Sequence, residues 1–400
     1  MSNVLAAINR WLVIIFVVLT TGFAFYTGGT GPFDTALHRG LFLLLMMPLV
    51  FLYVPSGLTK NPTVENACTL LAVVVSTVVF TWSVLYYVRL YSEPFLNNTD
   101  IVIGVLGLLL VLESVRRTVG LSITLIFCVF IAYAFAGPDV PIDALRHGGL
   151  SVEDIASQIF YGTDGVFGTP VGVAATFIVI IVMLGAVLNA TGGADLFMNL
   201  ANGIAGRFVG GPAKMAVIGS AMMGMITGAT VANVATTGSV TIPMMKRAGY
   251  GKNFAGAVEA LASSGGQLMP PIMGAAAFVM MDYLNLDYLQ LIKHAIIPSL
   301  LYFFSVLMVV HVRSVKNGFG RLDKSERPSI LSELKARGHM LLPIILLVVL
   351  LSQHLGMMFV AFLSVMSAVL LSLMKKETRL NAKGYYEAFD AGMRAMAPLV

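Results

Sequence analysis

Residues 214–246 read KMAVIGSAMMGMITGATVANVATTGSVTIPMMK, and this stretch decides how the chain can be arranged. It is mostly apolar, but Thr227-Gly228-Ala229-Thr230 interrupts it near its middle. Each half has about 15 residues, or roughly 22 Å of helix, which is too short to cross a hydrocarbon core of about 30 Å. Backbone without regular helix is tolerated at membrane depth only where protein buries it or where it lines a cavity. We therefore expect a re-entrant helical hairpin with a functional site at its tip.

The next segment, residues 253–283, is interrupted in a different way. Its middle carries Gly265-Gly266, then Pro270-Pro271, then Gly274. Proline lacks a backbone N–H and its ring clashes with the preceding turn, so a single helix cannot continue through this run. We expect one crossing of the membrane by two half-helices joined by an unwound link. Transporters bind substrates and coupling ions at such links.

The rest of the chain has the composition of a membrane protein. Of 400 residues, 58% are hydrophobic and 11% are Asp, Glu, Lys or Arg, whereas about a quarter of a soluble domain is charged. Together with the broken helix, the apolar runs predict an all-α polytopic membrane protein with about ten transmembrane helices. The other runs lie at 11–26, 40–54, 67–90, 101–113, 119–136, 171–190, 293–312, 341–354 and 356–374. The basic residues lie in loops between spans, so no nucleic acid is expected as a partner.

The distribution of Lys and Arg predicts the orientation. If the N-terminus is cytoplasmic and the spans alternate, 21 of the 25 Lys and Arg residues lie inside and four lie outside. This asymmetry is what the positive-inside rule requires. It holds only if residues 214–246 enter and leave on the cytoplasmic side. Residues 11–26 are taken as the first span because no small-residue cleavage site follows them.

Several motifs together resemble a known transporter family. They are GGPAK at 210–214, the hairpin tip, SSGGQLMPPIMGAAAF at 263–278 and RRTVG at 116–120. The chain resembles the membrane component of tripartite ATP-independent periplasmic (TRAP) transporters, in the TAXI subfamily whose small and large membrane subunits are fused. The resemblance implies an elevator-type fold in the bacterial inner membrane. It also implies ion-driven secondary uptake of a small organic anion delivered by a periplasmic substrate-binding protein.

The resemblance also implies a division into two parts. Residues 1–150 are expected to be small-subunit-like scaffold helices, and residues 151–400 the first part of the large transport domain. The second inverted repeat of that domain is expected to be missing. The family typically has Ser-Gly-Ser at the hairpin tip, where this chain has Thr227-Gly228-Ala229, so one hydroxyl is kept and one is lost.

The two interruptions supply the candidate binding residues. Hydroxyl, amide and freed carbonyl oxygens suit a hard cation, so Na⁺ is the favoured coupling ion, with H⁺ as the alternative. The expected Na⁺ ligands are Thr227, Thr230, Asn233, Gly265, Gly266 and Met269. The expected substrate contacts are Thr236, Thr237, Gln267, Pro270 and Pro271. The simpler interpretation of each hydroxyl is a hydrogen bond to its own helix.

Glu259 is the acid that lies within a span and away from flanking bases. A carboxyl group at membrane depth is a functional hypothesis by default, so Glu259 is a possible coupling acid for a proton. It lies seven residues after Lys252. A local ion pair with Lys252, or a polar contact between helices, is an equally open interpretation.

Two rival functions remain at this point. One is an ion-coupled anion symporter that works without a binding protein. The other is an intramembrane hydrolase using Ser263-Ser264-Gly265, but neither this span nor a neighbouring one offers a His or Asp as the general base. We therefore do not expect an enzyme, and we expect no cofactor beyond the coupling ion.

Overall fold

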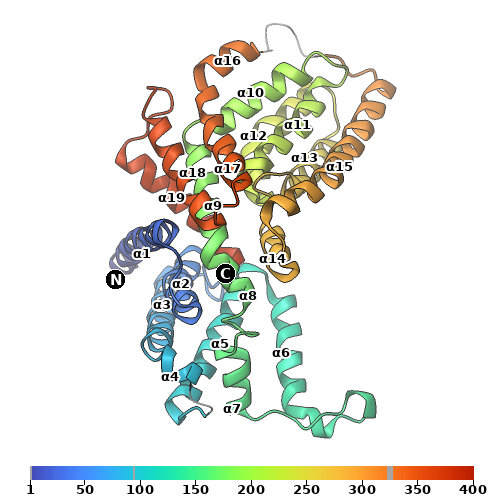
Figure 1. The fold of residues 1–400 in the computed structure, drawn as a ribbon. Coiled ribbons are helices and arrows are strands. Elements are labelled where there is room, and N and C mark those ends of the chain that lie inside the picture. The colour runs from blue at the N-terminus through green and yellow to red at the C-terminus, as the bar shows by residue number, and fades with distance from the viewer. Residues whose placement is uncertain (1, 93–94, 322–327) are drawn as a thin grey trace. The chain divides into compact units, whose positions relative to one another are not determined.

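The computed structural model describes residues 2–92, 95–321 and 328–400, and helices are the regular secondary structure throughout these ranges. The chain divides into two compact units (Figure 1). Unit 1 comprises residues 1–176 together with 396–400, and unit 2 comprises residues 177–395. Eight helices within the described ranges are long and apolar enough to cross a membrane. The prediction of an all-helical polytopic membrane protein is confirmed.

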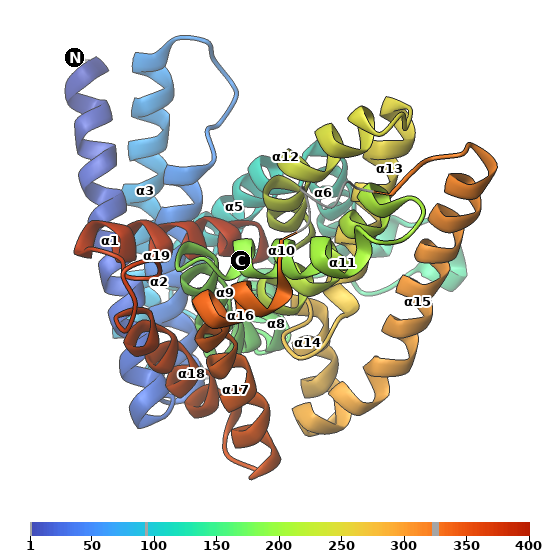
Figure 2. The ribbon, with the colours of Figure 1, turned by 90° about the horizontal axis from the view of Figure 1, so that it is seen from above.

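Unit 1 is built on long helices whose ends are marked by capping side chains. Its α-helices are α1 (Ser2–Thr30), α2 (Thr35–Tyr53), α3 (Pro62–Leu85), α4 (Tyr87–Ser92), α5 (Asn98–Thr118), α6 (Leu121–Ala136), α7 (Val152–Ile155) and α8 (Thr169–Val173). The Asp34 carboxylate accepts a hydrogen bond from the Ala36 N–H at the start of α2, and Asn97 and Asp100 form a capping box on α5. Helices α1, α2 and α3 pack side by side (Figure 2).

Residues 137–170, which lie between the predicted spans 119–136 and 171–190, contain short helical turns. Besides α7 these are two 3-10 turns, η1 (Gly137–Asp139) and η2 (Asp143–Leu145), and a π-helical turn, η3 (Ala156–Tyr161). The turn η3 places Phe160 in the core of unit 1, where its ring packs against Phe80 and Phe167. A second π-helical turn, η4 (Ala174–Ile178), follows α8.

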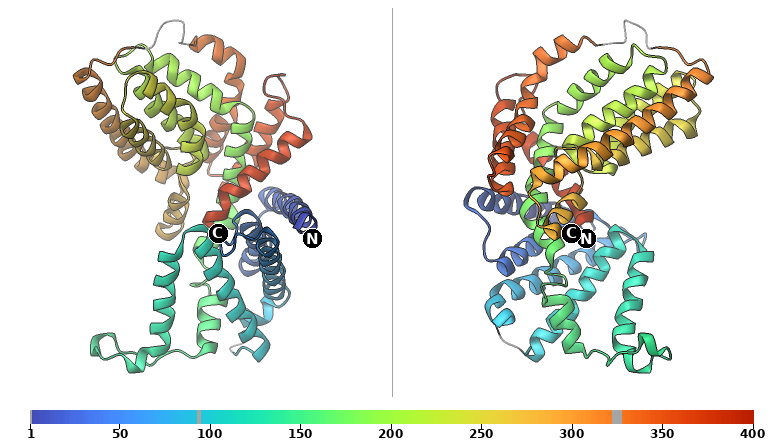
Figure 3. Two further views of the ribbon diagram at one scale, coloured as in Figure 1. Left: turned by 180° about the vertical axis from the view of Figure 1, so that it is seen from behind. Right: turned by 45° about the vertical axis from the view of Figure 1, so that its right-hand side comes forward.

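Unit 2 contains both interruptions. Its helices are α9 (Val179–Ala190), α10 (Gly193–Ala205), α11 (Gly211–Thr227), α12 (Thr230–Arg247), α13 (Lys252–Gly265), η5 (Gly266–Leu268), α14 (Ala275–Leu284), α15 (Tyr288–Lys316), α16 (Ile330–Arg337), η7 (Gly338–Leu341), α17 (Leu342–Ser352), α18 (Met357–Ser372) and α19 (Ala382–Met396). A last turn, η8 (Ala397–Leu399), belongs to unit 1. Helices α11, α12, α13 and α15 lie alongside one another (Figure 3).

The helices depart from the predicted spans mainly at their ends. Helix α15 has 29 residues where 293–312 was expected, and the expected span 171–190 is made of α8, η4 and α9 in succession. Helix α10 lies between the predicted span 171–190 and the predicted hairpin, where no span is predicted. Polar residues that cap or extend helix ends carry little hydropathy, so an apolar run underestimates the helix that contains it.

Candidate functional site

Helices α11 and α12 form the hairpin expected from residues 214–246. Gly228 ends α11 in the left-handed region, with φ of 58°, and its N–H donates to the Gly224 carbonyl at 3.1 Å. A Cβ atom on Gly228 would lie 2.0 Å from the Met273 carbonyl oxygen. Glycine is therefore required at the tip for both its backbone conformation and its contact with the broken helix.

The broken helix consists of α13, the single turn η5, a non-helical link at 269–274 and α14. The peptide bond between Pro270 and Pro271 is cis. The Gly274 N–H donates to the Gln267 carbonyl at 2.8 Å. The Tyr288 hydroxyl donates to the carbonyls of Pro271 at 2.8 Å and Ile272 at 2.5 Å. The link is thus held by specific hydrogen bonds although it has no helical ladder.

The hairpin and the broken helix touch through glycines. A Cβ on Gly224 of α11 would lie 2.3 Å from the Cα of Gly266, and a Cβ on Gly266 would lie 2.9 Å from Asn233 Nδ2. The Asn233 side chain is fully buried, and its Nδ2 donates to the Ser220 carbonyl at 2.8 Å. The structure therefore brings Asn233 and Gly266 together, with the amide nitrogen of Asn233 on the side of Gly266.

The threonines of the hairpin lie in different surroundings. Thr227 Oγ1 donates to the Met223 carbonyl at 3.1 Å and Thr236 Oγ1 to the Ala232 carbonyl at 2.9 Å, so both bond to their own helices. Thr227 also lines a cavity of about 100 Å³ with residues of α9 and α19. Thr230 is half-buried at the start of α12.

The remaining predicted residues are distributed around the break. Gly265 faces α15, because a Cβ there would lie 2.2 Å from the Tyr302 ring. The Met269 N–H donates to the Gly266 carbonyl at 3.2 Å, and the Met269 side chain packs against the core around Phe303. Gln267 is exposed, whereas Pro270 and Pro271 are buried.

Glu259 lies at the centre of a buried group of hydroxyls, which we call the Glu259 cluster. Its carboxylate accepts from Ser263 at 3.1 Å and Ser220 at 3.2 Å on Oε1, and from Thr241 at 2.5 Å on Oε2. Thr237 also donates to Oε1. All five side chains are fully buried. Among the described residues, neither Lys252 nor any other base forms an ion pair with Glu259. Of the two simpler interpretations, the structure has the polar contact between helices.

Sequence reasoning did not place Ser220, Thr241 or Ser263 beside Glu259, and Ser263 entered only through the rival hydrolase motif. A signal was present, because Thr237 and Thr241, like Glu259 and Ser263, are four residues apart and so share a helix face. Ser220 had no such partner on α11. Its place in the cluster depends on how α11 packs against α12 and α13.

The mouth of the hairpin is joined to α15 by polar contacts. Lys214 Nζ donates to His311 Nδ1 at 3.0 Å, and the hydroxyls of Tyr250 and Ser314 are 2.5 Å apart. Gly210, in the left-handed region, packs directly on Ser314. The ends of the hairpin are therefore anchored, while its tip rests on the link.

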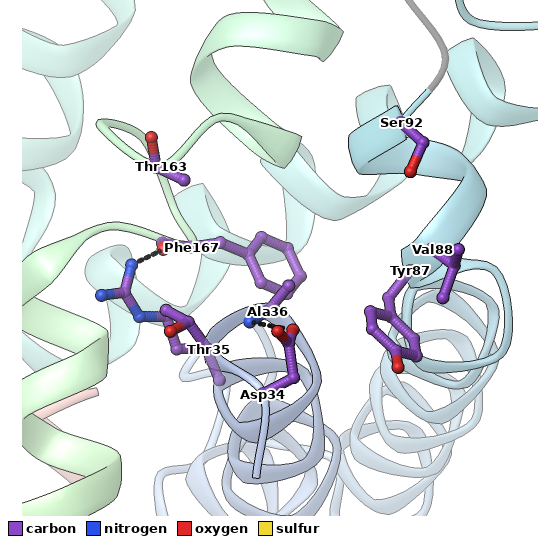
Figure 4. Close-up of a pocket in the computed structure, with 9 residues that line it drawn as sticks. Asp34, Thr35, Ala36, Tyr87, Val88, Ser92, Thr163 and Phe167 are labelled. Atoms are coloured by element: carbon purple, nitrogen blue, oxygen red, sulfur yellow. Dashed lines mark hydrogen bonds between the residues drawn. The ribbon is translucent and has the colours of Figure 1, made fainter. Parts of the chain in front are cut away.

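Unit 1 has a cavity of about 440 Å³, lined by residues of α2, α4 and the loop before α8 (Figure 4). The Arg39 guanidinium donates to the Phe167 carbonyl at 2.6 Å, and Asp34 caps α2. Both charged side chains are thus used to hold local backbone. The charged side chains that line the cavity therefore have a structural role.

A protein family and several known proteins are similar to this chain. The family described as "Tripartite ATP-independent periplasmic transporter, DctM component" matches residues 106–400. An isethionate TRAP transporter permease protein DctMQ of Oleidesulfovibrio alaskensis is 28% identical over 50% of this chain and 30% of its own length. A C4-dicarboxylate TRAP transporter large permease protein DctM of Vibrio cholerae is 25% identical over 49% of this chain and 44% of its own.

An uncharacterised protein of Sinorhizobium fredii is also similar, with 28% identity over 44% of this chain and 42% of its own length. The chain thus spans less than half the length of each of these three relatives. The family match covers both the hairpin and the broken helix and most of the chain. On that match, this chain belongs to the family of the DctM component of tripartite ATP-independent periplasmic transporters.

Proposed function

We propose that this chain provides membrane helices for the ion-driven uptake of a small organic anion across the bacterial inner membrane. Uptake depends on a periplasmic substrate-binding protein, as the family description suggests. The observation that carries the proposal is the contact of Gly224 and Asn233 with Gly266, where two interrupted helices meet. Interrupted helices at membrane depth are where transporters hold substrates and ions.

The proposed arrangement follows the TAXI type of this family, in which small and large membrane subunits are fused. Residues 1–150 serve as scaffold and residues 151–400 as the first part of the transport domain, with an elevator-type movement. The N-terminus and the mouth of the hairpin face the cytoplasm. Support for this orientation comes from the distribution of 25 Lys and Arg residues along the sequence.

Na⁺ is the proposed coupling ion at the hairpin tip and the link. In a continuous helix the carbonyls of Gly266 and Gln267 would accept from residues 270 and 271, but both are proline and have no N–H. Each carbonyl instead accepts one bond, from Met269 and Gly274 respectively. A carbonyl oxygen has two lone pairs, so each keeps acceptor capacity for a cation. The proposed ligand set is completed by Thr227, Thr230, Asn233, Gly265 and Met269.

The substrate is proposed to be a small organic acid, because relatives are named for isethionate and for C4-dicarboxylates. Its proposed contacts are Thr236, Thr237, Gln267, Pro270 and Pro271. The exposed Gln267 amide can donate to a carboxylate or sulfonate without first breaking a buried hydrogen bond.

The test is uptake into liposomes that contain the natural full-length protein. Radiolabelled isethionate and succinate are supplied under an inward Na⁺ gradient, with and without a cognate periplasmic substrate-binding protein. Uptake that needs both the gradient and the binding protein supports the proposal. Equally fast uptake without the binding protein identifies an independent symporter instead, and no uptake under any gradient refutes the transport function.

A further inference from the structure

The Glu259 cluster joins three helices that belong to the two interrupted elements. Ser220 comes from α11, Thr237 and Thr241 from α12, and Glu259 with Ser263 from α13. The hydrogen bonds of Glu259 with Ser220, Thr237 and Thr241 therefore connect the broken helix to the hairpin. A change in the separation of these elements must change the surroundings of the carboxyl group.

Charge compensation for Glu259 is missing from the helices packed around it. Helix α13 packs against α11, α12, α15 and η5. Some of their titratable groups are engaged elsewhere: Lys214 with His311, Tyr302 with the Leu261 carbonyl and Tyr288 with the Pro271 carbonyl. The others are exposed: Lys246, Arg247, Lys252, Lys293, His294, Arg313 and Lys316. The polar groups that surround Glu259 are therefore the hydroxyls of the cluster.

The hydroxyl arrangement accommodates the neutral acid. Thr237 Oγ1 lies 2.8 Å from the Asn233 carbonyl as well as in contact with Glu259. If Glu259 carries a proton on Oε1, it can donate to Thr237, and Thr237 can donate to the Asn233 carbonyl. The Thr237 hydroxyl then accepts one hydrogen bond and donates one, without conflict. The oxygens of the cluster are already at hydrogen-bond distance, so a proton on Glu259 requires no movement of the side chains.

We propose that Glu259 is a proton-carrying site that is occupied while the hairpin packs on the broken helix and is emptied when the two elements separate. The proton passes to water that enters between α12 and α13, and the carboxylate that remains takes up a proton on the other side of the membrane. This inference rests on the proposed function and adds a proton to the coupling ions of the same transport unit. Asn233, which contacts both Gly266 and Thr237, connects the cluster to the proposed Na⁺ site.

The decisive variant is Glu259→Gln, which keeps the shape and hydrogen-bonding capacity of the side chain but cannot carry a proton. Glu259→Asp keeps the proton, and Glu387→Gln makes the same chemical change at an exposed acid of α19. The natural full-length protein and its binding protein are reconstituted with a pH-sensitive dye inside the liposomes. Substrate-linked proton entry and gradient-free substrate exchange are measured for each variant.

We expect substrate-linked proton entry in the wild type and in Glu387→Gln, and slower proton entry in Glu259→Asp. In Glu259→Gln, proton entry should fall at least tenfold while substrate exchange persists. Proton entry in Glu259→Gln equal to that of the wild type overturns the inference. Na⁺-driven uptake in the wild type without any proton entry also overturns it but leaves the proposed function intact.

A spectroscopic measurement does not depend on transport. The infrared C=O band of a neutral carboxylic acid in the purified protein should disappear in Glu259→Gln and persist in Glu387→Gln. If the wild type lacks this band, the inference is wrong even where the transport function is established. If the band is present but no anion is transported, the proton site is supported and the proposed function fails.

Discussion

Gly224 and Gly266 lie so close together that a Cβ atom on Gly224 would be 2.3 Å from the Cα of Gly266. The neighbouring atoms are backbone and cannot move aside as the end of a flexible side chain can. Close packing of small residues is how helices associate in lipid. The hairpin therefore packs directly against the break in the helix. This contact fixes how far the hairpin residues of the proposed Na⁺ site and of the Glu259 cluster lie from those of the broken helix.

We expect Gly224→Ala to destabilise the protein by about 1–3 kcal/mol, because an added methyl group has no space at this contact. The matched control is Gly256→Ala on α13, where nothing lies within 4 Å of the new Cβ; this change should be neutral or stabilise by up to about 1 kcal/mol. Thermal unfolding in detergent measures both. Equal melting temperatures for the two variants would contradict the close approach.

The hairpin tip offers a second glycine test. Gly228→Ala should destabilise the hairpin through both its left-handed backbone and the contact of the new Cβ with the Met273 carbonyl. Gly318→Ala has a similar φ, +67°, but open space around it, so it isolates the backbone cost of about 1 kcal/mol. Transport and protease resistance should therefore fall further in Gly228→Ala. A loss no larger than that of Gly318→Ala would mean that the tip does not rest on the link.

Asn233→Ala should raise the Na⁺ concentration needed for half-maximal uptake by about tenfold, which is the effect of losing roughly 1.5 kcal/mol of a charge-assisted contact. Ser264→Ala serves as the control, because its exposed hydroxyl bonds only to the Ala260 carbonyl of its own helix. Initial rates over a Na⁺ series distinguish the variants. An unchanged Na⁺ dependence in Asn233→Ala would remove this residue from the ion site.

Cysteine labelling in intact cells tests the orientation. Cys68 and Cys128 are first replaced by Ser, and single cysteines are then placed at exposed Arg247 and at exposed Asp143. An impermeant maleimide should label position 143 from outside and position 247 only after permeabilisation, because the positive-inside rule places the hairpin mouth in the cytoplasm. Labelling of position 247 in intact cells would reverse the topology.

The last prediction concerns the buried acid of unit 1. Asp100 accepts from both Arg89 Nη atoms at 2.7 Å and from Trp82 Nε1 at 2.9 Å. Asp100→Ala removes these three hydrogen bonds from a fully buried carboxylate and should cost about 3–5 kcal/mol. Lys383→Ala, which breaks the exposed pair with Glu387, should cost less than about 1 kcal/mol. Similar melting temperatures for the two variants would contradict this difference.

The sequence by itself determined the membrane class and the positions of both interruptions. The membrane class follows from the hydropathy of each segment. The interruptions follow from local backbone effects at Gly228, Gly274 and the Pro270-Pro271 pair. Neither the membrane class nor the interruptions depend on distant residues. The structure has helix ends at Thr227 and Gly265, where these local signals predict them.

Only the tertiary structure decided which side chains meet. Gly265 and Gly266 are adjacent in sequence, yet the first faces Tyr302 of α15 and the second faces Gly224 and Asn233. Successive residues on a helix point about 100° apart, and the rotation of each helix about its axis is set by packing with its neighbours. The same rotation brings Ser220, Thr237 and Thr241 from two helices onto Glu259 of a third, a convergence that no spacing along the chain specifies.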